Sequence, residues 1–189
     1  MNKTECRRLM KAKLSLMDEV ELKQKSLSLS KNLVLLFSEL LVIQKKMSIG
    51  AFAPLQRVQE ALWYLELPSE CHDLTAYPFI DSQMKVMSFK KTSLSELVEK
   101  KDFGFSILGP KEEAQQLVPE MLLIPGLAFS PKGERLGRGK GFYDKYLTHY
   151  LGIKIGVGFS LQILESLPTE EHDVKLDYIV TEEKIIKCK

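Results

Sequence analysis

The stretch MLLIP, at residues 121–125, decides the fold, because it is apolar throughout and is followed directly by GLAFSPKGERLGRGKGFYDKYL, at residues 126–147. A strand without polar alternation is typical of the centre of a sheet that is covered on both faces. In open α/β sheets, ligands bind beyond the carboxyl ends of the strands. The segment after Pro125 is therefore the predicted position of a binding site.

Apolar segments on both sides of this strand alternate between strand and helix patterns. The predicted strands lie at 47–52, 73–80, 85–89, 154–159 and 178–187. The predicted helices lie at 2–18, 20–46, 57–67, 93–100 and 142–150. This alternation predicts the α/β class, as a three-layer α/β/α arrangement with a largely parallel central sheet and N-terminal helices. We expect one domain over residues 1–189, with the N-terminal helices lying across its body.

Composition and charge exclude several classes of protein. The 189 residues are 44% hydrophobic and 28% charged, with a net charge of +2, which indicates neither disorder nor a nucleic-acid-binding protein. The first residues, MNKTECRRLMKAKL, lack the apolar core of a signal peptide, and the most apolar run, 33–43, is too short to span a bilayer. The cysteines, Cys6, Cys71 and Cys188, form no CxxC pair. We expect a cytoplasmic monomer with reduced cysteines and no membrane partner.

The loop after the central strand combines glycines with cations. Gly137, Gly139 and Gly141 can adopt positive φ, so that several N–H groups converge on one anion. Arg135, Arg138 and Lys140 add full charges, and the helix predicted to follow adds its N-terminal dipole. A polyphosphate is the ligand that this pattern favours. The alternative is a mobile surface loop with solvated cations.

Two standard phosphate-binding motifs do not fit this loop. A Walker A loop needs glycine where Glu134 stands, and GxGxxG needs glycine where Phe142 stands. Asp144, one turn into the predicted helix, has two interpretations: it binds Mg²⁺ that bridges phosphate oxygens, or it complements the helix dipole. Asp173, next to His172, is a weaker candidate for metal binding, and a zinc role for His172 is not favoured.

The stretch IPGLAFSPKGERLGRGKGFYDKYL, at 124–147, resembles the signature of the 5-formyltetrahydrofolate cyclo-ligase family, I-P-G-x-A-F-D-x-x-G-x-R-L-G-x-G-x-G-Y-Y-D-x-x-L. Ser130 replaces the usual Asp and Phe142 the first Tyr. Weaker similarities extend the resemblance over almost the whole chain. They are KTECR at 3–7, DFGFSILGP at 102–110 (without the family's Glu) and LPTEEHDVKLDYIVTE at 167–182.

The resemblance implies an enzyme that uses ATP and Mg²⁺ to convert 5-formyltetrahydrofolate into 5,10-methenyltetrahydrofolate, with a phosphorylated formyl intermediate. It implies catalytic roles for Arg135, Arg138 and Lys140, and Mg²⁺ binding by Asp144 and Asp173. The residues implied to hold ATP are Lys3, Thr4, Glu5, Cys6, Arg7, Arg135, Leu136, Gly137, Arg138, Gly139, Lys140, Gly141, Phe142 and Tyr143. Those implied to contact the folate are Arg7, Phe52, Arg57, Arg138, Gly139, Lys140, Gly141 and Phe142.

One departure from the family concerns the folate. Family members carry a glutamate that contacts the pterin, in Y-x-P-x-x-x-E-V-D-T, whereas FAPLQRVQE at 52–60 has Arg57 in its place and Glu60 three residues later. A carboxylate can accept a pair of pterin N–H groups, and arginine has no acceptor. Either Glu60 or another acid substitutes, or folate binding is weaker, or the substrate is a different formyl or carboxyl compound.

A third hypothesis is a non-enzymatic binder of single-stranded nucleic acid. KGERLGRGKGFYDKY, at 132–146, mixes cations with aromatic residues as such proteins do. However, Tyr143, Leu147 and Tyr150 fall on one helical face, which indicates core packing, and the net charge is nearly neutral. We therefore expect small-molecule ligands, ATP and a reduced folate, and no nucleic acid.

Overall fold

The structure, a computed structural model, describes residues 2–55, 59–81, 83–84, 86–102, 105–168, 170 and 173–189. Its helices are α1 (Lys3–Ser15), α2 (Glu19–Glu39), α3 (Ser69–His72) and α4 (Phe142–Leu147), with 3₁₀ turns at Leu94–Glu96 and Ser160–Gln162. Its strands are β1 (Ile49–Gly50), β2 (Thr75–Asp81), β3 (Val86–Lys91), β4 (Val98–Asp102), β5 (Phe105–Gly109), β6 (Gln116–Leu117), β7 (Met121–Pro125), β8 (Ala128–Phe129), β9 (Arg135–Leu136), β10 (Ile153–Val157), β11 (Tyr178–Val180) and β12 (Ile185–Lys187).

Within the described residues, eight strands form one sheet in the order β12-β11-β10-β7-β1-β2-β3-β6. The strands from β11 to β2 pair in parallel, and the antiparallel strands β12, β3 and β6 extend the two edges. The hairpins β4–β5 and β8–β9 lie outside this sheet. The predicted α/β class with a largely parallel central sheet is confirmed.

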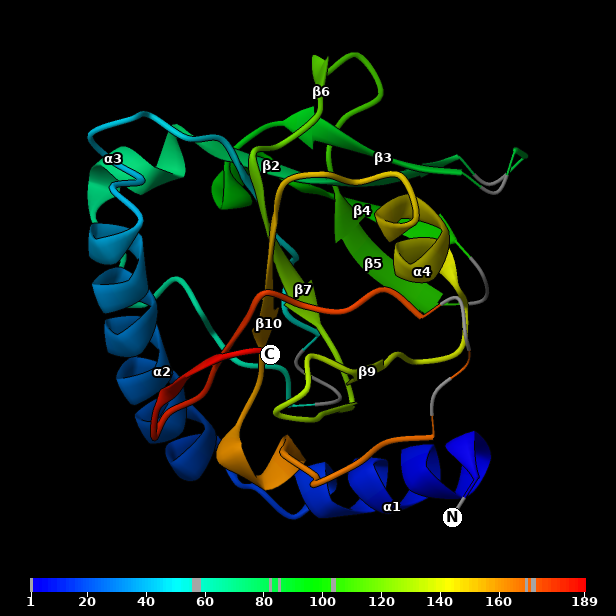
Figure 1. Cartoon of the computed structure of the whole chain (residues 1–189). Coiled ribbons are helices and arrows are strands. Elements are labelled where there is room, and N and C mark those ends of the chain that lie inside the picture. The colour runs from blue at the N-terminus through cyan, green and yellow to red at the C-terminus, as the bar shows by residue number, and fades with distance from the viewer. Residues whose placement is uncertain are drawn as a thin grey trace.

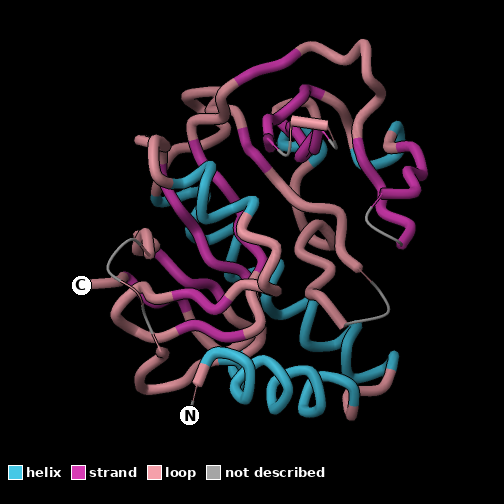
Figure 2. Tube along the Cα trace, turned by 90° about the vertical axis from the view of Figure 1, so that its right-hand side faces the viewer, coloured by secondary structure: helices cyan, strands magenta, loops and turns pink. Residues whose placement is uncertain are grey.

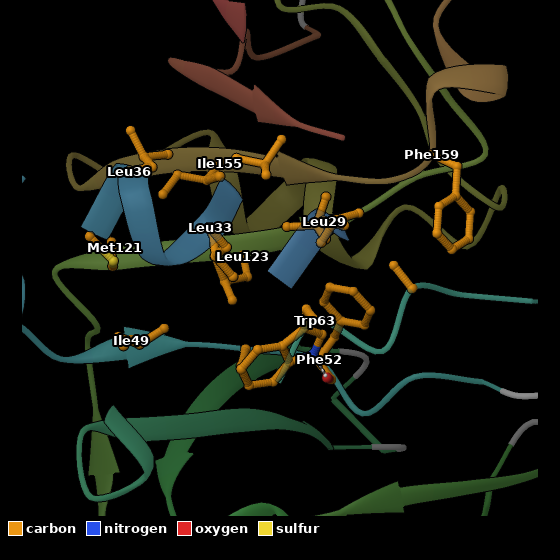
Figure 3. Packing of buried hydrophobic residues seen from close by; sticks show 14 of the residues in the cluster. Leu29, Leu33, Leu36, Ile49, Phe52, Trp63, Met121, Leu123, Ile155 and Phe159 are labelled. Carbon is orange, nitrogen blue, oxygen red and sulfur yellow. Dashed lines mark hydrogen bonds between the residues drawn. The ribbon is translucent and has the colours of Figure 1, made fainter. Parts of the chain in front are cut away.

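Strand β7 shows why its sequence is apolar throughout. Met121 and Leu123 belong to the core cluster that α1 and α2 cover, whereas Leu122 and Ile124 belong to the cluster that α4 covers. Figure 3 shows leucines of α2 lying over Met121 and Leu123. Figure 1 shows α2 and α4 on opposite sides of the sheet, with α1 across one end, and Figure 2 shows α1 from the side.

The helix predicted at 57–67 is wrong over the residues that the structure describes, since 59–67 forms turns. Two of its backbone N–H groups bond to serine hydroxyls of α2: the N–H of Leu62 donates to Ser26 Oγ at 3.0 Å, and the N–H of Glu66 donates to Ser30 Oγ at 2.8 Å. Trp63 is fully buried, and its Nε1–H donates to the Phe52 carbonyl at 2.9 Å. Tertiary contacts therefore override the helical spacing of the apolar residues.

Several other predicted elements differ in extent. The helix predicted at 20–46 ends at Glu39, and turns follow it. The helix predicted at 93–100 is a 3₁₀ turn, Leu94–Glu96, followed by β4. The segment 178–187 forms the antiparallel pair β11–β12 rather than one strand. The helix predicted at 142–150 ends at Leu147. Among the helices that the structure describes, none combines the length and the apolar character needed to cross a lipid bilayer.

Candidate active site

The glycine-rich loop lies where the sequence predicts it, at the carboxyl end of β7. The chain leaves β7 at Pro125, forms the β8–β9 hairpin and enters α4 at Phe142. Gly139 and Gly141 have φ of +96° and +73°, a region that L side chains rarely adopt. Among the described residues, the N–H groups of these two glycines donate to no other protein group. The loop therefore presents main-chain donors to a ligand.

Helix α1 is joined to this loop by Arg7. The Arg7 Nε–H donates to the Gly137 carbonyl at 2.9 Å, and a Cβ at Gly139 would lie 3.5 Å from Arg7 Cζ. The neighbouring α1 residues that are implied in ATP binding make no side-chain hydrogen bond to this loop within the described residues: Thr4 and Glu5 face solvent and Cys6 faces the core. Thr4 and Glu5 are exposed, and the Glu5 carboxylate accepts the Asn2 N–H in a capping box. Cys6 is completely buried among core side chains, and its N–H donates to the Asn2 carbonyl, so its side chain does not face a ligand site.

Lys3 pairs with the segment before β11. Its Nζ lies 3.1 Å from Asp173 Oδ2 and 3.1 Å from Glu170 Oε1. Desolvation lowers the pKa of Lys3, but these carboxylates outweigh it and raise the pKa above its ordinary value. Asp173, one of the implied Mg²⁺ ligands, is thus held by a cation of α1, while His172 lies outside the described residues.

Arg135 holds the base of the loop from inside. Its side chain is almost buried, 6% exposed; the guanidinium donates to the Pro125 carbonyl at 3.2 Å and pairs with the Asp144 carboxylate. Its Cζ also lies 5.6 Å from the ring centre of Tyr143. Asp144, the other implied Mg²⁺ ligand, is therefore fixed between β9 and α4. In the part of the chain that the structure describes, no group of three or more His, Cys, Asp or Glu side chains converges on one point.

A buried carboxylate faces the loop. Arg138 donates from Nε to Glu60 Oε1 at 3.1 Å, and Glu60 Oε2 accepts the Leu55 N–H at 2.8 Å. Burial raises the pKa of the Glu60 carboxyl, and the neighbouring Arg138 opposes this shift. Arg57 lies outside the described residues, so its position in the family pattern has no structural counterpart here. Glu60 is the acid that the sequence offered as its substitute.

These groups enclose a cavity of about 200 Å³. One side is the loop 137–141 with Glu60, Arg135, Tyr143 and Asp144. The other side is an apolar wall from β1, β2, β3 and β5, to which Phe52, Pro78, Ile80, Met87, Ile107 and Leu108 contribute. The Tyr143 hydroxyl is buried and makes no hydrogen bond, and burial raises the pKa of this phenol, so it remains a neutral donor that a ligand could satisfy.

Residues 1–182 match the 5-formyltetrahydrofolate cyclo-ligase family. The chain belongs to this family. It is 37% identical to the 5-formyltetrahydrofolate cyclo-ligase of Escherichia coli over 83 residues, 40% of this chain and 46% of that protein. It is 34% identical to the probable 5-formyltetrahydrofolate cyclo-ligase of Schizosaccharomyces pombe over 101 residues, 44% of this chain and 50% of that protein. The chain thus spans about half the length of these curated relatives.

Solved structures extend this cyclo-ligase family likeness to the whole chain. The 5,10-methenyltetrahydrofolate synthetase of Aquifex aeolicus has 28% sequence identity and a TM-score of 0.80, and the match covers 100% of this chain and 94% of that one. The 5,10-methenyltetrahydrofolate synthetase of Mycoplasma pneumoniae has 21% identity and a TM-score of 0.72 over 96% and 99% of the two chains. The second comparison shows a shared fold.

Of the apolar wall of the cavity in this cyclo-ligase family member, the sequence resemblance pointed to Phe52 and not to the residues of β2, β3 and β5. Pro78 and Ile80 alternate on β2, and Ile80 pairs with Met87 of β3, so these side chains share one face of the sheet. Alternation of this kind predicts a buried face, but it does not distinguish a cavity wall from solid core. One signal could have revealed these wall residues. The loop at 137–141 that lies opposite them is polar, so part of the apolar face has no apolar partner.

Proposed function

We propose that this chain converts 5-formyltetrahydrofolate into 5,10-methenyltetrahydrofolate with ATP and Mg²⁺, releasing ADP and phosphate. The observation that carries the proposal is the two-sided cavity. Unbonded main-chain N–H groups, cations and the buried Glu60 carboxylate lie on the loop side, and an apolar wall lies opposite. The N–H groups and cations suit a polyphosphate, and the carboxylate together with the apolar wall suits a heterocycle with paired N–H donors. Membership of the cyclo-ligase family agrees with both halves.

For ATP, we assign the phosphates to the loop. The N–H groups of Gly139 and Gly141 would bond phosphate oxygens, and Arg138 and Lys140, which line the same cavity, would neutralise their charge. Because α4 has six residues, the loop rather than the helix dipole carries this preference. Arg7 holds the loop to α1 through the Gly137 carbonyl and lies beside Gly139.

For Mg²⁺, the carboxylates offer oxygen ligands of the kind that it prefers. Mg²⁺ in such sites is held by one or two carboxylates together with substrate phosphates. Asp144 lines the cavity beside the loop and is the first candidate ligand. Asp173 is the second, by way of its contact with Lys3 on the α1 face that also carries Arg7. Bound to the phosphates, the ion would supply charge neutralisation as the terminal phosphoryl group is transferred.

For the folate, Glu60 takes the role of the pterin acceptor. Its Oε1 accepts two N–H groups of Arg138, and its Oε2 accepts the Leu55 N–H and keeps a lone pair for a pterin N–H group. The wall formed by Ile80, Met87 and Leu108 would pack on the ring. Glu60 would thereby supply the carboxylate that family members carry at the position of Arg57.

The reaction that this arrangement serves needs alignment more than covalent help from the protein. The formyl oxygen on N5 attacks the γ-phosphorus, an O–P bond forms, and the bond to the β-phosphate oxygen breaks to release ADP. N10 then attacks the formyl carbon and loses its proton, and the C–O bond breaks to release phosphate. Lys140 and Arg138 would stabilise the charge on the transferred group in both steps.

The test is turnover of purified protein with 5-formyltetrahydrofolate and Mg²⁺-ATP, followed by the absorbance of the methenyl product and by phosphate release. We expect equal amounts of both products, and none when ATP is withheld. No conversion under these conditions would overturn the proposal. Tight ATP binding without folate binding, measured by calorimetry, would favour instead a family member that acts on another formyl or carboxyl compound.

A variant tests the folate half separately. Glu60→Gln keeps an acceptor for Arg138 but removes the charge, and we expect the KM for the folate to rise about tenfold with the KM for ATP unchanged. The matched control is Glu66→Gln, which makes the same change on an exposed side chain that does not line the cavity. A Glu60→Gln enzyme with an unaltered folate KM would exclude Glu60 as the pterin acceptor.

A further inference from the structure

A second hollow adjoins the cavity of the proposed active site. It has a volume of about 400 Å³ and lies between α4 and the β3 edge of the sheet. Met87 and Phe142 line both the cavity and this hollow, so the two are neighbours that share these side chains as a wall. We call the second hollow the tail groove. It lies next to the cavity, on the far side of these two side chains.

The tail groove has an aromatic floor. The Tyr146 ring centre lies 5.1 Å from that of Phe89 and 5.7 Å from that of Tyr150. The Tyr150 hydroxyl donates to the Pro119 carbonyl at 2.8 Å, which fixes that ring in place. Val86 and Val118 line the groove and are 56% and 73% exposed. Such a surface suits a flat aromatic group, since ring contacts of this kind add to the burial of apolar area.

Among the residues that line the tail groove, Lys145 is the one with a full charge, and His149 adds an imidazole. Both side chains are exposed, and none of the lining residues carries a carboxylate. Lys145 supplies a full positive charge, and an imidazole can donate a hydrogen bond in either protonation state. The groove therefore favours a group that is aromatic at one end and anionic at the other.

We propose that the tail groove binds the aminobenzoyl-glutamate tail of the reduced folate, with the ring on Tyr146 and the carboxylates toward Lys145 and His149. The inference rests on the proposed function. In that substrate the benzoyl ring is attached to N10, the atom that closes the new ring, so the tail must leave the cavity from the reacting end. Met87 and Phe142 border both hollows, so the proposed path of the tail runs over these two side chains.

The experiment compares two substrates that differ in the charge of the tail. One is 5-formyltetrahydrofolate, and the other carries a methylamide in place of the glutamate, so that N10 and the ring remain and the tail carboxylates are gone. For Lys145→Glu we expect kcat/KM to fall about tenfold with the first substrate and by less than about twofold with the second. His149→Ala is expected to act in the same direction, with a smaller loss.

The matched control is Lys132→Glu, the same change of charge on an exposed lysine that lines neither hollow. Its neighbour Gly133 accepts the Leu176 N–H, at the other side of the β8–β9 hairpin from the loop. We expect it to leave both substrates unaffected. Equal losses on the two substrates with Lys145→Glu, or no loss on either, overturn the assignment of the groove.

A measurement without turnover separates this inference from the proposed function. Free aminobenzoyl-glutamate at millimolar concentration is added to the wild-type protein, and the amide resonances of residues 145–150 are followed by NMR. Movement of these resonances, reduced in Lys145→Glu, supports the groove even if no methenyl product forms. Unchanged resonances overturn it even if the enzyme is active.

Discussion

The two sides of the active-site cavity are built in different ways. The loop side is fixed by polar contacts. Two of them, Arg7 to Gly137 and Arg138 to Glu60, join residues far apart in the chain, and the third joins Arg135 to Asp144 nine positions later. The opposite wall is fixed by alternation on paired strands, as in Ile80 and Met87. A polar network specifies one geometry and loses it when one partner is removed, whereas an apolar face tolerates changes of similar volume. We therefore expect substitutions on the loop side to affect catalysis strongly. Substitutions of similar volume in the apolar wall should mainly affect the shape of the cavity.

The largest effect is expected on the loop side. Lys140→Ala should lower kcat by about a hundredfold, because it removes a full charge from the place where the phosphoryl group is transferred. Lys140 is exposed, so the free energy of unfolding should change by less than about 0.5 kcal/mol. Steady-state kinetics together with urea unfolding measure both quantities.

Lys132→Ala is the control for Lys140→Ala, since it removes an exposed lysine of the same basic stretch that does not line the cavity. Its kcat should equal that of the wild type. If Lys140→Ala also turned over at the wild-type rate, Lys140 would not stabilise the transferred phosphoryl group. The assignment of the phosphates to the loop would then be wrong.

The next largest effect is expected at Tyr143, where one substitution should raise stability and lower activity. The buried Tyr143 hydroxyl makes no hydrogen bond, so Tyr143→Phe should raise the free energy of unfolding by about 1 kcal/mol. If that hydroxyl serves a ligand, the same variant should lower kcat/KM by about tenfold. Urea unfolding of the ligand-free protein and kinetics on the same preparation test the two signs together.

Tyr150→Phe is the matched control for stability. The Tyr150 hydroxyl is bonded to the Pro119 carbonyl, so its removal leaves a buried acceptor unsatisfied and should lower the free energy of unfolding by about 1 kcal/mol. A loss of stability in both variants would show that the Tyr143 hydroxyl has a partner in solution and is not reserved for a ligand.

The difference between the two sides also explains what the sequence could predict. The strand Met121–Pro125 and the loop after it follow from local patterns, apolar run and spaced glycines, and the structure has both in place. The α/β order follows in the same way. The helix prediction for 59–67 was wrong because two amides of this segment bond to serines of α2. The spacing of apolar residues within a segment carries no information about such distant partners.

The candidate site could be predicted from the sequence only where its residues lie close together in the chain. Arg135, Arg138 and Lys140 stand together in the sequence, and the structure places them around one cavity. The bond between Arg138 and Glu60 joins residues 78 positions apart, and Glu60 entered the sequence argument only as one of several possible acids. The wall of Ile80, Met87 and Leu108 gave no separate signal, because a cavity wall and a core face have the same alternation.

The smallest effect concerns the shape of the loop itself. At Gly141 a Cβ would meet nothing within 4 Å, so Gly141→Ala tests the φ of +73° without a steric clash, and we expect a loss of about 1 kcal/mol in the free energy of unfolding. Gly109→Ala, where φ is not positive and a Cβ would have contacts of 3.6 Å or more, should change it by less than about 0.5 kcal/mol. If the two variants were equally stable, the left-handed turn at Gly141 would not be the conformation in solution. The main-chain donors that we assign to the phosphates would then lose their basis, while the apolar wall would be untouched.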